Sequence, residues 1–253
     1  MQRRPDHAAP RLRHERPEQD GRDGRNGRAG TGRPDAAPAR ETSDTLAGLL
    51  DDALALPGPR TLLGLAGPPG AGKSVLARAL IAAACERLGD GAAAYVPLDG
   101  FHLSTSRLEQ LGLTDRKGSP PSFDAHGYAA LLRRIADAPP HTVHVPDYDR
   151  ALHEPVAARH TVEPHCRLVV TEGNYLALDG PGWREARALL HALWYVDAPD
   201  GLREERLRAR HRGNGSSPER AAARVSGNDR PNGEQVKAAR SRCDRTVLAP
   251  PLG

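Results

Sequence analysis

The stretch GPPGAGKS at residues 67–74 constrains this chain more than any other feature. Its glycines, lysine and serine fill every fixed position of the pattern G-x-x-x-x-G-K-[ST], in which the backbone N–H groups surround a phosphate. The apolar run TLLGLAG before it is typical of a strand, and KSVLARALIAAACERLG after it is typical of a helix. One of only three lysines in the chain stands at the position that needs one. The sequence therefore predicts a phosphate-binding loop made of Gly67, Pro68, Pro69, Gly70, Ala71, Gly72, Lys73, Ser74 and Val75.

Strand-like and helix-like segments alternate along the rest of the chain. The expected strands are near-continuous apolar runs, which indicate a parallel sheet covered by helices on both faces. We therefore expect an α/β protein with the P-loop NTPase three-layer fold, a mostly parallel sheet and a helical lid. The expected strands are 61–67, 93–99, 167–173, 192–199 and 245–249, and the expected helices after the loop are 73–89, 124–138, 181–190, 202–211, 217–229 and 233–244.

Composition divides the chain into a tail and a folded part. Residues 1–41 contain ten Arg, one Leu and no Val, Ile, Phe, Tyr or Trp, so they cannot bury enough apolar surface to offset the entropy of ordering. We predict a disordered Arg/Gly/Pro-rich tail at 1–41 and one P-loop domain at 42–253. The tail carries most of the formal charge of +4. The near-neutral remainder gives no reason to expect a nucleic-acid partner, and RNA binding by the tail is the alternative.

The same composition bears on compartment and partners. The three cysteines are far apart and form no CxxC pair, which is typical of a reduced, cytoplasmic protein. No apolar run approaches the ~18 residues that would span a membrane. The N-terminus has charges but no apolar segment of the kind found in signal peptides. We expect a cytoplasmic protein with no membrane partner. The sequence leaves open whether it forms a homodimer.

A carboxylate follows the second predicted strand. The stretch AAYVPLDG ends its apolar run at Asp99 and Gly100. An Asp-Gly pair is common in turns. The carboxyl ends of parallel strands, however, meet at one edge of a sheet, so Asp99 should lie beside the phosphate loop. A carboxylate there can accept the proton of a hydroxyl that attacks a phosphate.

Three segments resemble one group of enzymes. LDGFHLSTSRLEQLGLTDRKGSPPSFD (98–124), VPDYDR (145–150) and VVTEGNY (169–175) are similar to the matching segments of type I pantothenate kinase, uridine kinase and phosphoribulokinase. The resemblance covers about residues 60–250. It implies that Asp99 is the catalytic base and that Glu172 helps to hold Mg²⁺, which the Ser74 hydroxyl of the loop motif is expected to ligate.

The resembling segments also supply the candidate acceptor contacts. Phe and Tyr side chains suit a ring, and a basic side chain suits an anionic group. Packing in the core is the alternative for each aromatic residue. The expected acceptor contacts are Asp99, Phe101, His102, Lys117, Tyr148, Arg150, Asn174 and Tyr175.

Arginines follow the fourth predicted strand of the sheet. Arg203, Arg206 and Arg210 share one face of the predicted helix. The resembling kinases carry a lid at this point, whose arginines stabilise charge on the transferred phosphoryl group. We assign that catalytic role to Arg206 and Arg210, beside Lys73 and Asp99. SGNDRPN (226–232) also resembles the group but receives no role.

These observations predict a kinase that uses ATP and Mg²⁺. It would transfer the γ-phosphate to a hydroxyl of a small molecule, and a nucleoside, pantothenate or a sugar-like compound all remain open. The alternative is a nucleotide-hydrolysing switch or binding module without an acceptor. A GTPase switch would need a base-specificity signal such as N-K-x-D, and the sequence contains none.

Overall fold

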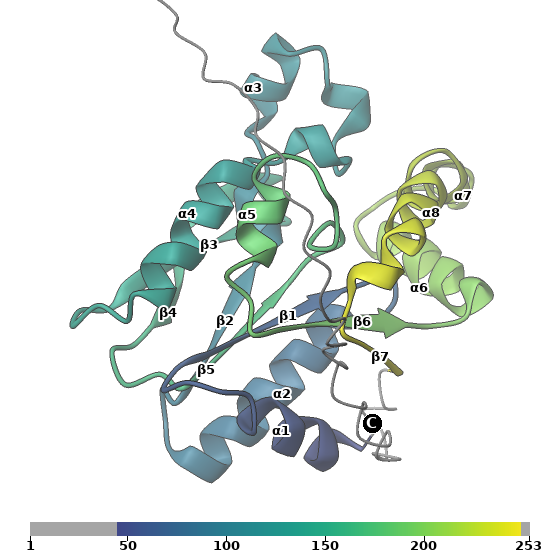
Figure 1. Ribbon diagram of the computed structural model, residues 1–253. Helices are drawn as coiled ribbons and strands as arrows, with labels where there is room; N and C mark the ends of the chain where they lie inside the picture. The colour runs from purple at the N-terminus through teal and green to yellow at the C-terminus, as the bar shows by residue number, and fades with distance from the viewer. Residues whose placement is uncertain (1–44, 249–253) are drawn as a thin grey trace, which may run out of the picture. The chain divides into compact units, whose positions relative to one another are not determined.

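The computed structural model describes residues 45–248. The predicted tail at 1–41 lies outside the described residues. Five parallel strands form a sheet in the order β2-β5-β1-β6-β7, with helices on both faces (Figure 1). The predicted α/β three-layer architecture is therefore confirmed. The strands are β1 (Thr61–Ala66), β2 (Ala93–Pro97), β5 (Leu168–Glu172), β6 (Ala192–Asp197) and β7 (Arg245–Leu248).

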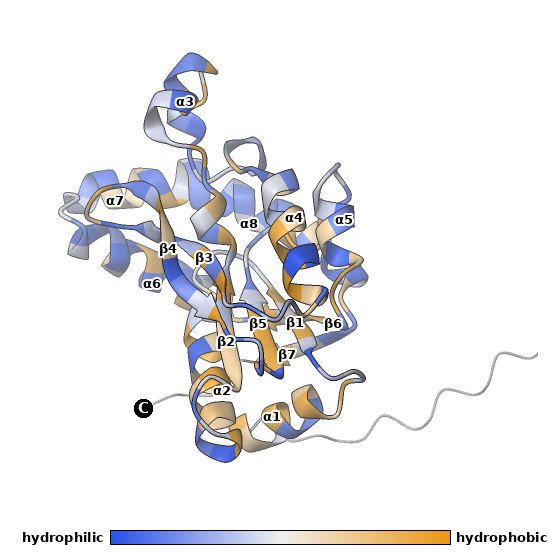
Figure 2. Ribbon diagram, turned by 90° about the vertical axis from the view of Figure 1, so that its left-hand side faces the viewer, coloured by the Kyte–Doolittle hydropathy of each residue, from blue (hydrophilic) through white to orange (hydrophobic). Residues whose placement is uncertain are grey.

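Helices cover the sheet because its strands are apolar on both faces. In β1, Leu63 packs towards α1 and α2, whereas its neighbour Leu62 packs towards α4 and α5. Every residue of β1 is buried, and the parallel strands are mostly hydrophobic in Figure 2. The covering helices are α1 (Leu46–Leu54), α2 (Lys73–Leu88), α4 (Ala125–Ala136) and α5 (Trp183–Arg187).

A helical segment follows β6 and returns to β7. It is more polar than the covering helices, as the blue of α6 and α7 in Figure 2 shows. The predicted helix at 217–229 is α-helical only to Arg224, and a π-helical turn, Val225–Asp229, completes it. The segment consists of α6 (Asp200–Gly213), α7 (Pro218–Arg224), that π-helical turn and α8 (Arg230–Ala238).

An antiparallel hairpin, which the sequence analysis did not predict, stands beside β2. It consists of β3 (Val143–Asp149) and β4 (Glu154–Val162), and its pairing shifts between Val145 and Asp147. Pro146 lies at that shift, where its missing N–H costs no ladder bond. A short helix, α3 (Thr105–Gln110), precedes the hairpin in the chain. The hairpin packs against β2 and the turn after it.

The second predicted strand ends earlier than expected. β2 stops at Pro97, and Leu98–Phe101 form a 3₁₀ turn. Asp99 therefore projects from a turn just beyond the strand rather than from the strand itself. All the carboxyl ends still meet at one edge, because every pairing in the sheet is parallel.

Candidate active site

The phosphate loop joins β1 to α2 and is built on glycines that admit no side chain. A Cβ on Gly67 would lie 2.3 Å from the carbonyl oxygen of Val196, and one on Gly70 would lie 2.7 Å from that of Arg203. Both glycines have positive φ angles of 152° and 80°, which L side chains adopt only with strain. The loop backbone can therefore lie directly against the backbone of β6 and α6.

Lys73, the first residue of α2, lies inside this loop. Its Nζ donates hydrogen bonds to the carbonyl oxygens of Gly67 (2.9 Å) and Pro68 (3.1 Å) and to Oδ1 of Asn174 (2.7 Å). Burial lowers the pKa of Lys73 to about 8, although Glu172 opposes that shift. Asn174, expected to contact the acceptor, thus lies against the lysine of the loop.

Glu172 ends β5 and points at α2. Its Oε1 accepts hydrogen bonds from Ser74 Oγ (2.8 Å) and from the hydroxyl of Tyr95 (2.7 Å). The carboxylate is buried, at 6% exposed. Burial raises the pKa of Glu172, and the adjacent Lys73 opposes that rise. The predicted metal pair, Ser74 and Glu172, is therefore in direct contact. The sequence analysis missed Tyr95, which also donates to Glu172.

Asp99 stands at the same edge and is open to solvent. Its Oδ2 lies 3.8 Å from Nη2 of Arg150, and the two side chains are 41% and 55% exposed, so a ligand can reach both. Asp99 also interacts electrostatically with Lys73 and Glu172. Close packing explains why glycine occupies position 100, because a Cβ there would lie 2.3 Å from the carbonyl oxygen of Pro146 in the hairpin.

Aromatic side chains from the 98–124 segment and from the hairpin meet beside Asp99. The ring of His102 lies 4.0 Å from that of Phe123 and 4.8 Å from that of Tyr148. Lys117 lies over the ring of Tyr148, and its Nζ donates to the carbonyl oxygen of His153 (2.7 Å). The structure thus brings His102, Lys117 and Tyr148 together where the 102–118 segment meets the hairpin.

Two other predicted acceptor contacts lie deeper. The ring of Phe101 packs edge-on against buried Tyr128, and Tyr175 is fully buried. The Tyr175 hydroxyl donates to the carbonyl oxygen of Gly118 (2.5 Å). Both rings therefore pack against core residues, and their contact with an acceptor stays a prediction.

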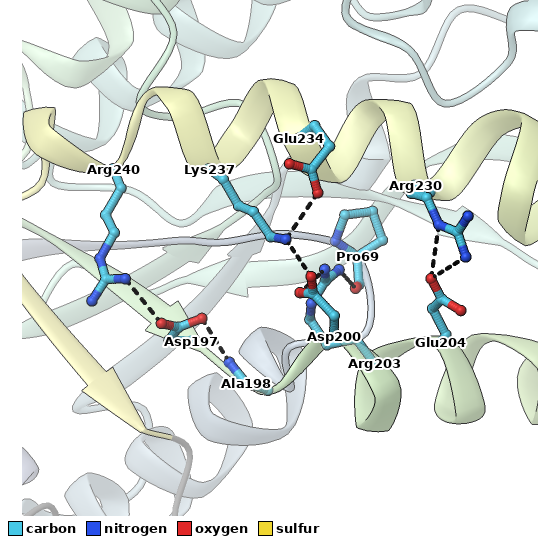
Figure 3. A network of polar contacts seen from close by, with 10 residues as sticks. All are labelled: Pro69, Asp197, Ala198, Asp200, Arg203, Glu204, Arg230, Glu234, Lys237 and Arg240. Carbon is cyan, nitrogen blue, oxygen red and sulfur yellow. Dashed lines mark hydrogen bonds and ion pairs between the residues drawn. The ribbon is translucent and has the colours of Figure 1, made fainter.

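The three arginines of α6 have different partners. Arg203 is buried; its guanidinium donates to the carbonyl oxygen of Pro69 (3.0 Å) and to Asp200 (2.6 Å). Figure 3 shows Arg203 between Pro69 of the loop and Asp200 of α6. It also shows the ion pairs that join α6 to α8, such as that between Asp200 and Lys237. Arg206 donates to the carbonyl oxygen of Gly70 (3.2 Å). Arg203, which we did not select from the sequence, is thus the buried anchor of the loop.

Arg210 lies further along α6 and interacts electrostatically with Lys73 of the loop. Burial lowers the pKa of Arg210, and the like charge of Arg150 lowers it further, whereas Asp229 and Asp99 raise it. Arg210 thus interacts with both members of the Asp99–Arg150 pair. Of the two predicted lid arginines, Arg206 contacts the phosphate loop, and Arg210 interacts electrostatically with Asp99 and Arg150.

The residues present fit a nucleotide and a magnesium ion. The glycine cradle, the buried ammonium of Lys73 and the start of α2 are the features that bind phosphates. Mg²⁺ favours oxygen ligands and is commonly held by one or two protein oxygens together with substrate phosphates. Ser74 and Glu172 could supply those protein oxygens. Within residues 45–248, no group of three or more His, Cys, Asp or Glu side chains could hold a metal by itself.

Known proteins resemble the chain over most of its length. A protein named "putative uridine kinase" from Schizosaccharomyces pombe is 34% identical over 176 residues, covering 67% of this chain and 75% of that protein. The ATP-dependent kinase YFH7 of Zygosaccharomyces rouxii is 29% identical, covering 56% of this chain and 47% of that protein. The crystal structure of a "putative fructose transport system kinase" from Silicibacter sp. TM1040 is 38% identical, with a TM-score of 0.70 over 80% of this chain and 98% of that one. No family model matches the chain.

The parallel sheet and the glycine cradle with its buried lysine define a P-loop protein, and the relatives narrow the class. The chain belongs to the uridine kinase group of P-loop kinases. It is an ATP-dependent phosphotransferase. The predicted group and enzyme class are thus confirmed. Among the described helices, none combines the length and apolar character needed to cross a membrane.

Proposed function

We propose that this kinase transfers the γ-phosphate of ATP to a hydroxyl group of a small molecule, with Asp99 as the general base. The observation that carries the proposal is the position of Asp99. It is a solvent-accessible carboxylate at the sheet edge of the phosphate loop, in electrostatic contact with Lys73 and bordered by the hairpin. A carboxylate placed there can take the proton of an acceptor hydroxyl.

The chain's own residues divide the work. The loop amides and Lys73 bind the triphosphate, and Ser74 and Glu172 hold Mg²⁺. When bound, that ion neutralises charge on the phosphate oxygens. Asp99 accepts the hydroxyl proton as the acceptor oxygen bonds to the γ-phosphorus, while the bond from that phosphorus to the bridging oxygen breaks and ADP leaves. Arg206 and Arg210 offset the charge that develops on the transferred group.

The wall opposite the loop receives the acceptor. His102, Tyr148 and Lys117 form an aromatic and basic surface beside Asp99. Among the described carboxylates, only Asp99 forms an ion pair with Arg150, at 3.8 Å. This surface suits a compact polar molecule that presents a hydroxyl to Asp99. Phe101 and Tyr175 support this wall from the core, and Asn174 orients Lys73.

The test is the substitution Asp99→Asn, with Asp115→Asn as the control at an exposed position of the same segment. ADP release is measured with uridine, fructose, pantothenate and glycerate, and ATP affinity is titrated without an acceptor. We expect kcat to fall by roughly 10²–10⁴ while ATP affinity is kept, because Asn holds the shape but takes no proton. A rate independent of every acceptor, or unchanged kcat in Asp99→Asn, would contradict the proposal.

A further inference from the structure

One hydroxyl outside the loop contacts the carboxylate at the end of β5. Tyr95 stands in β2, the strand that pairs with β5, two residues before Pro97, the register partner of Glu172. Alternate residues of a strand share a face, so Tyr95 points to the side of the sheet that Glu172 occupies. Its hydroxyl lies 2.7 Å from Oε1 of Glu172. This contact joins residues 77 positions apart in the chain.

The two donors on Glu172 bind the same oxygen. Ser74 Oγ and the Tyr95 hydroxyl both donate to Oε1. Among the described residues, no hydrogen bond reaches Oε2. Two donors on one oxygen fix the rotation of a carboxylate and leave the other oxygen available to a cation. A tyrosine hydroxyl carries its own proton, so at this distance it acts as a donor to the carboxylate oxygen.

The Tyr95 ring is itself held in place by side chains from two elements. The His160 ring of the hairpin meets it edge-on at 5.2 Å, and the Arg78 guanidinium of α2 lies 5.5 Å from its centre. His160 Nε2 lies 2.9 Å from Oδ2 of Asp147, across the hairpin. The aromatic ring alone would fill this space as phenylalanine does, so packing gives no reason for the hydroxyl.

We infer that Tyr95 is a positioning residue, which holds Glu172 in the orientation that leaves Oε2 free to bind a divalent cation. The inference rests on the proposed role of Glu172 in metal binding. Ligating carboxylates are commonly oriented by such hydrogen bonds, and the loss of one outer donor typically weakens metal binding 10–100-fold. Tyr95 touches no substrate; it acts through Glu172.

The experiment measures Mn²⁺ binding directly. The full chain is mixed with ADP, and free Mn²⁺ is followed by electron paramagnetic resonance for the wild type, Tyr95→Phe, Glu172→Gln and the double variant. We expect Tyr95→Phe to raise the Mn²⁺ dissociation constant about 10-fold. The control is Tyr195→Phe, a buried tyrosine of β6 with no contact to Glu172, which should leave that constant unchanged. Melting curves establish that each variant is folded.

The double variant separates positioning from a general structural effect. If Tyr95 acts through Glu172, adding Tyr95→Phe to Glu172→Gln should cause no further loss, so the two effects are not additive. Wild-type Mn²⁺ affinity in Tyr95→Phe alongside a loss in Glu172→Gln would overturn the inference and leave the proposed function standing. Wild-type affinity in Glu172→Gln would overturn both the inference and the proposed metal role of Glu172. Full additivity in the double variant would also overturn the inference.

Discussion

The substitution Gly100→Ala tests how closely the hairpin and the Asp99 turn are packed. The added Cβ would lie 2.3 Å from the carbonyl oxygen of Pro146, 2.5 Å from its carbonyl carbon and 2.9 Å from the backbone nitrogen of Asp147. Normal C···O contacts begin near 3.3 Å, so the hairpin backbone has to move by about 1 Å. These neighbours are backbone atoms, which cannot rotate away as a side chain can.

Two magnitudes follow from that displacement. Overpacking of this kind costs about 1–3 kcal/mol, which corresponds to a fall in Tm of roughly 2–12 °C for a domain of this size. The hairpin also carries Tyr148 and Arg150 past Asp99, and a misplacement of about 1 Å can cost 10²-fold in rate. The phosphate loop follows a different strand, so ATP affinity should stay at the wild-type value.

The assay combines melting curves, acceptor-dependent ADP release and ATP titration. Gly201→Ala is the matched control, since a Cβ at Gly201 in α6 meets nothing within 4 Å. It should leave the kinetics unchanged and stabilise the domain by up to about 1 kcal/mol. Wild-type Tm and acceptor kinetics in Gly100→Ala would refute the close approach of the hairpin. An equal loss of ATP affinity would refute the separation of the two halves of the site.

The remaining predictions concern Lys73 and the tail. Burial lowers the pKa of Lys73 from 10.5 to about 8. Between these two pH values the unfolded chain binds more protons at this group than the native protein does. The contribution of Lys73 to the free energy of unfolding therefore rises with pH from about 8 to 10.5. Near pH 9, ATP binding should therefore be accompanied by the uptake of a proton by Lys73. Calorimetry in buffers of different ionisation enthalpy measures this uptake. The substitution Lys73→Ala should abolish both the proton uptake and ATP turnover. Deletion of residues 1–41 should leave Tm and turnover unchanged, because the tail has almost no apolar side chains; a large fall in either would contradict the predicted boundary.

The sequence predicted the parallel sheet and the loop because both are local signals. An unbroken apolar run such as residues 61–66 indicates a strand buried on both faces, and the loop pattern is contiguous. The hairpin gave no comparable signal. Its strands are only partly buried, only one residue of β4 is buried, and Pro146 interrupts β3. Patterns of burial predict elements that are buried, so a half-exposed hairpin escapes them.

In the candidate site, too, the sequence predicted the residues that lie in motifs but not the contacts that depend on the tertiary structure. Ser74 was expected to work with Glu172 because each is placed by its own motif, and the two do meet. The contact of Tyr95 depends on the register between β2 and β5, which periodicity does not determine. Which arginine of α6 anchors the phosphate loop depends on which one faces the loop backbone in the folded protein. Arg203 faces Pro69 only because of how α6 crosses the loop.

The position of β1 in the sheet affects how the chain acquires its activity during synthesis. This strand is made early, but its hydrogen-bonding neighbours come much later: Thr61 pairs with Leu168, and Leu63 pairs with Ala192. Such distant pairings are slow to form, since long chain segments must close before they contribute stability. The residues that cradle phosphate therefore exist on a growing chain well before their supporting strands do. A nucleotide that binds only the finished site therefore favours the folded state over its incomplete precursors.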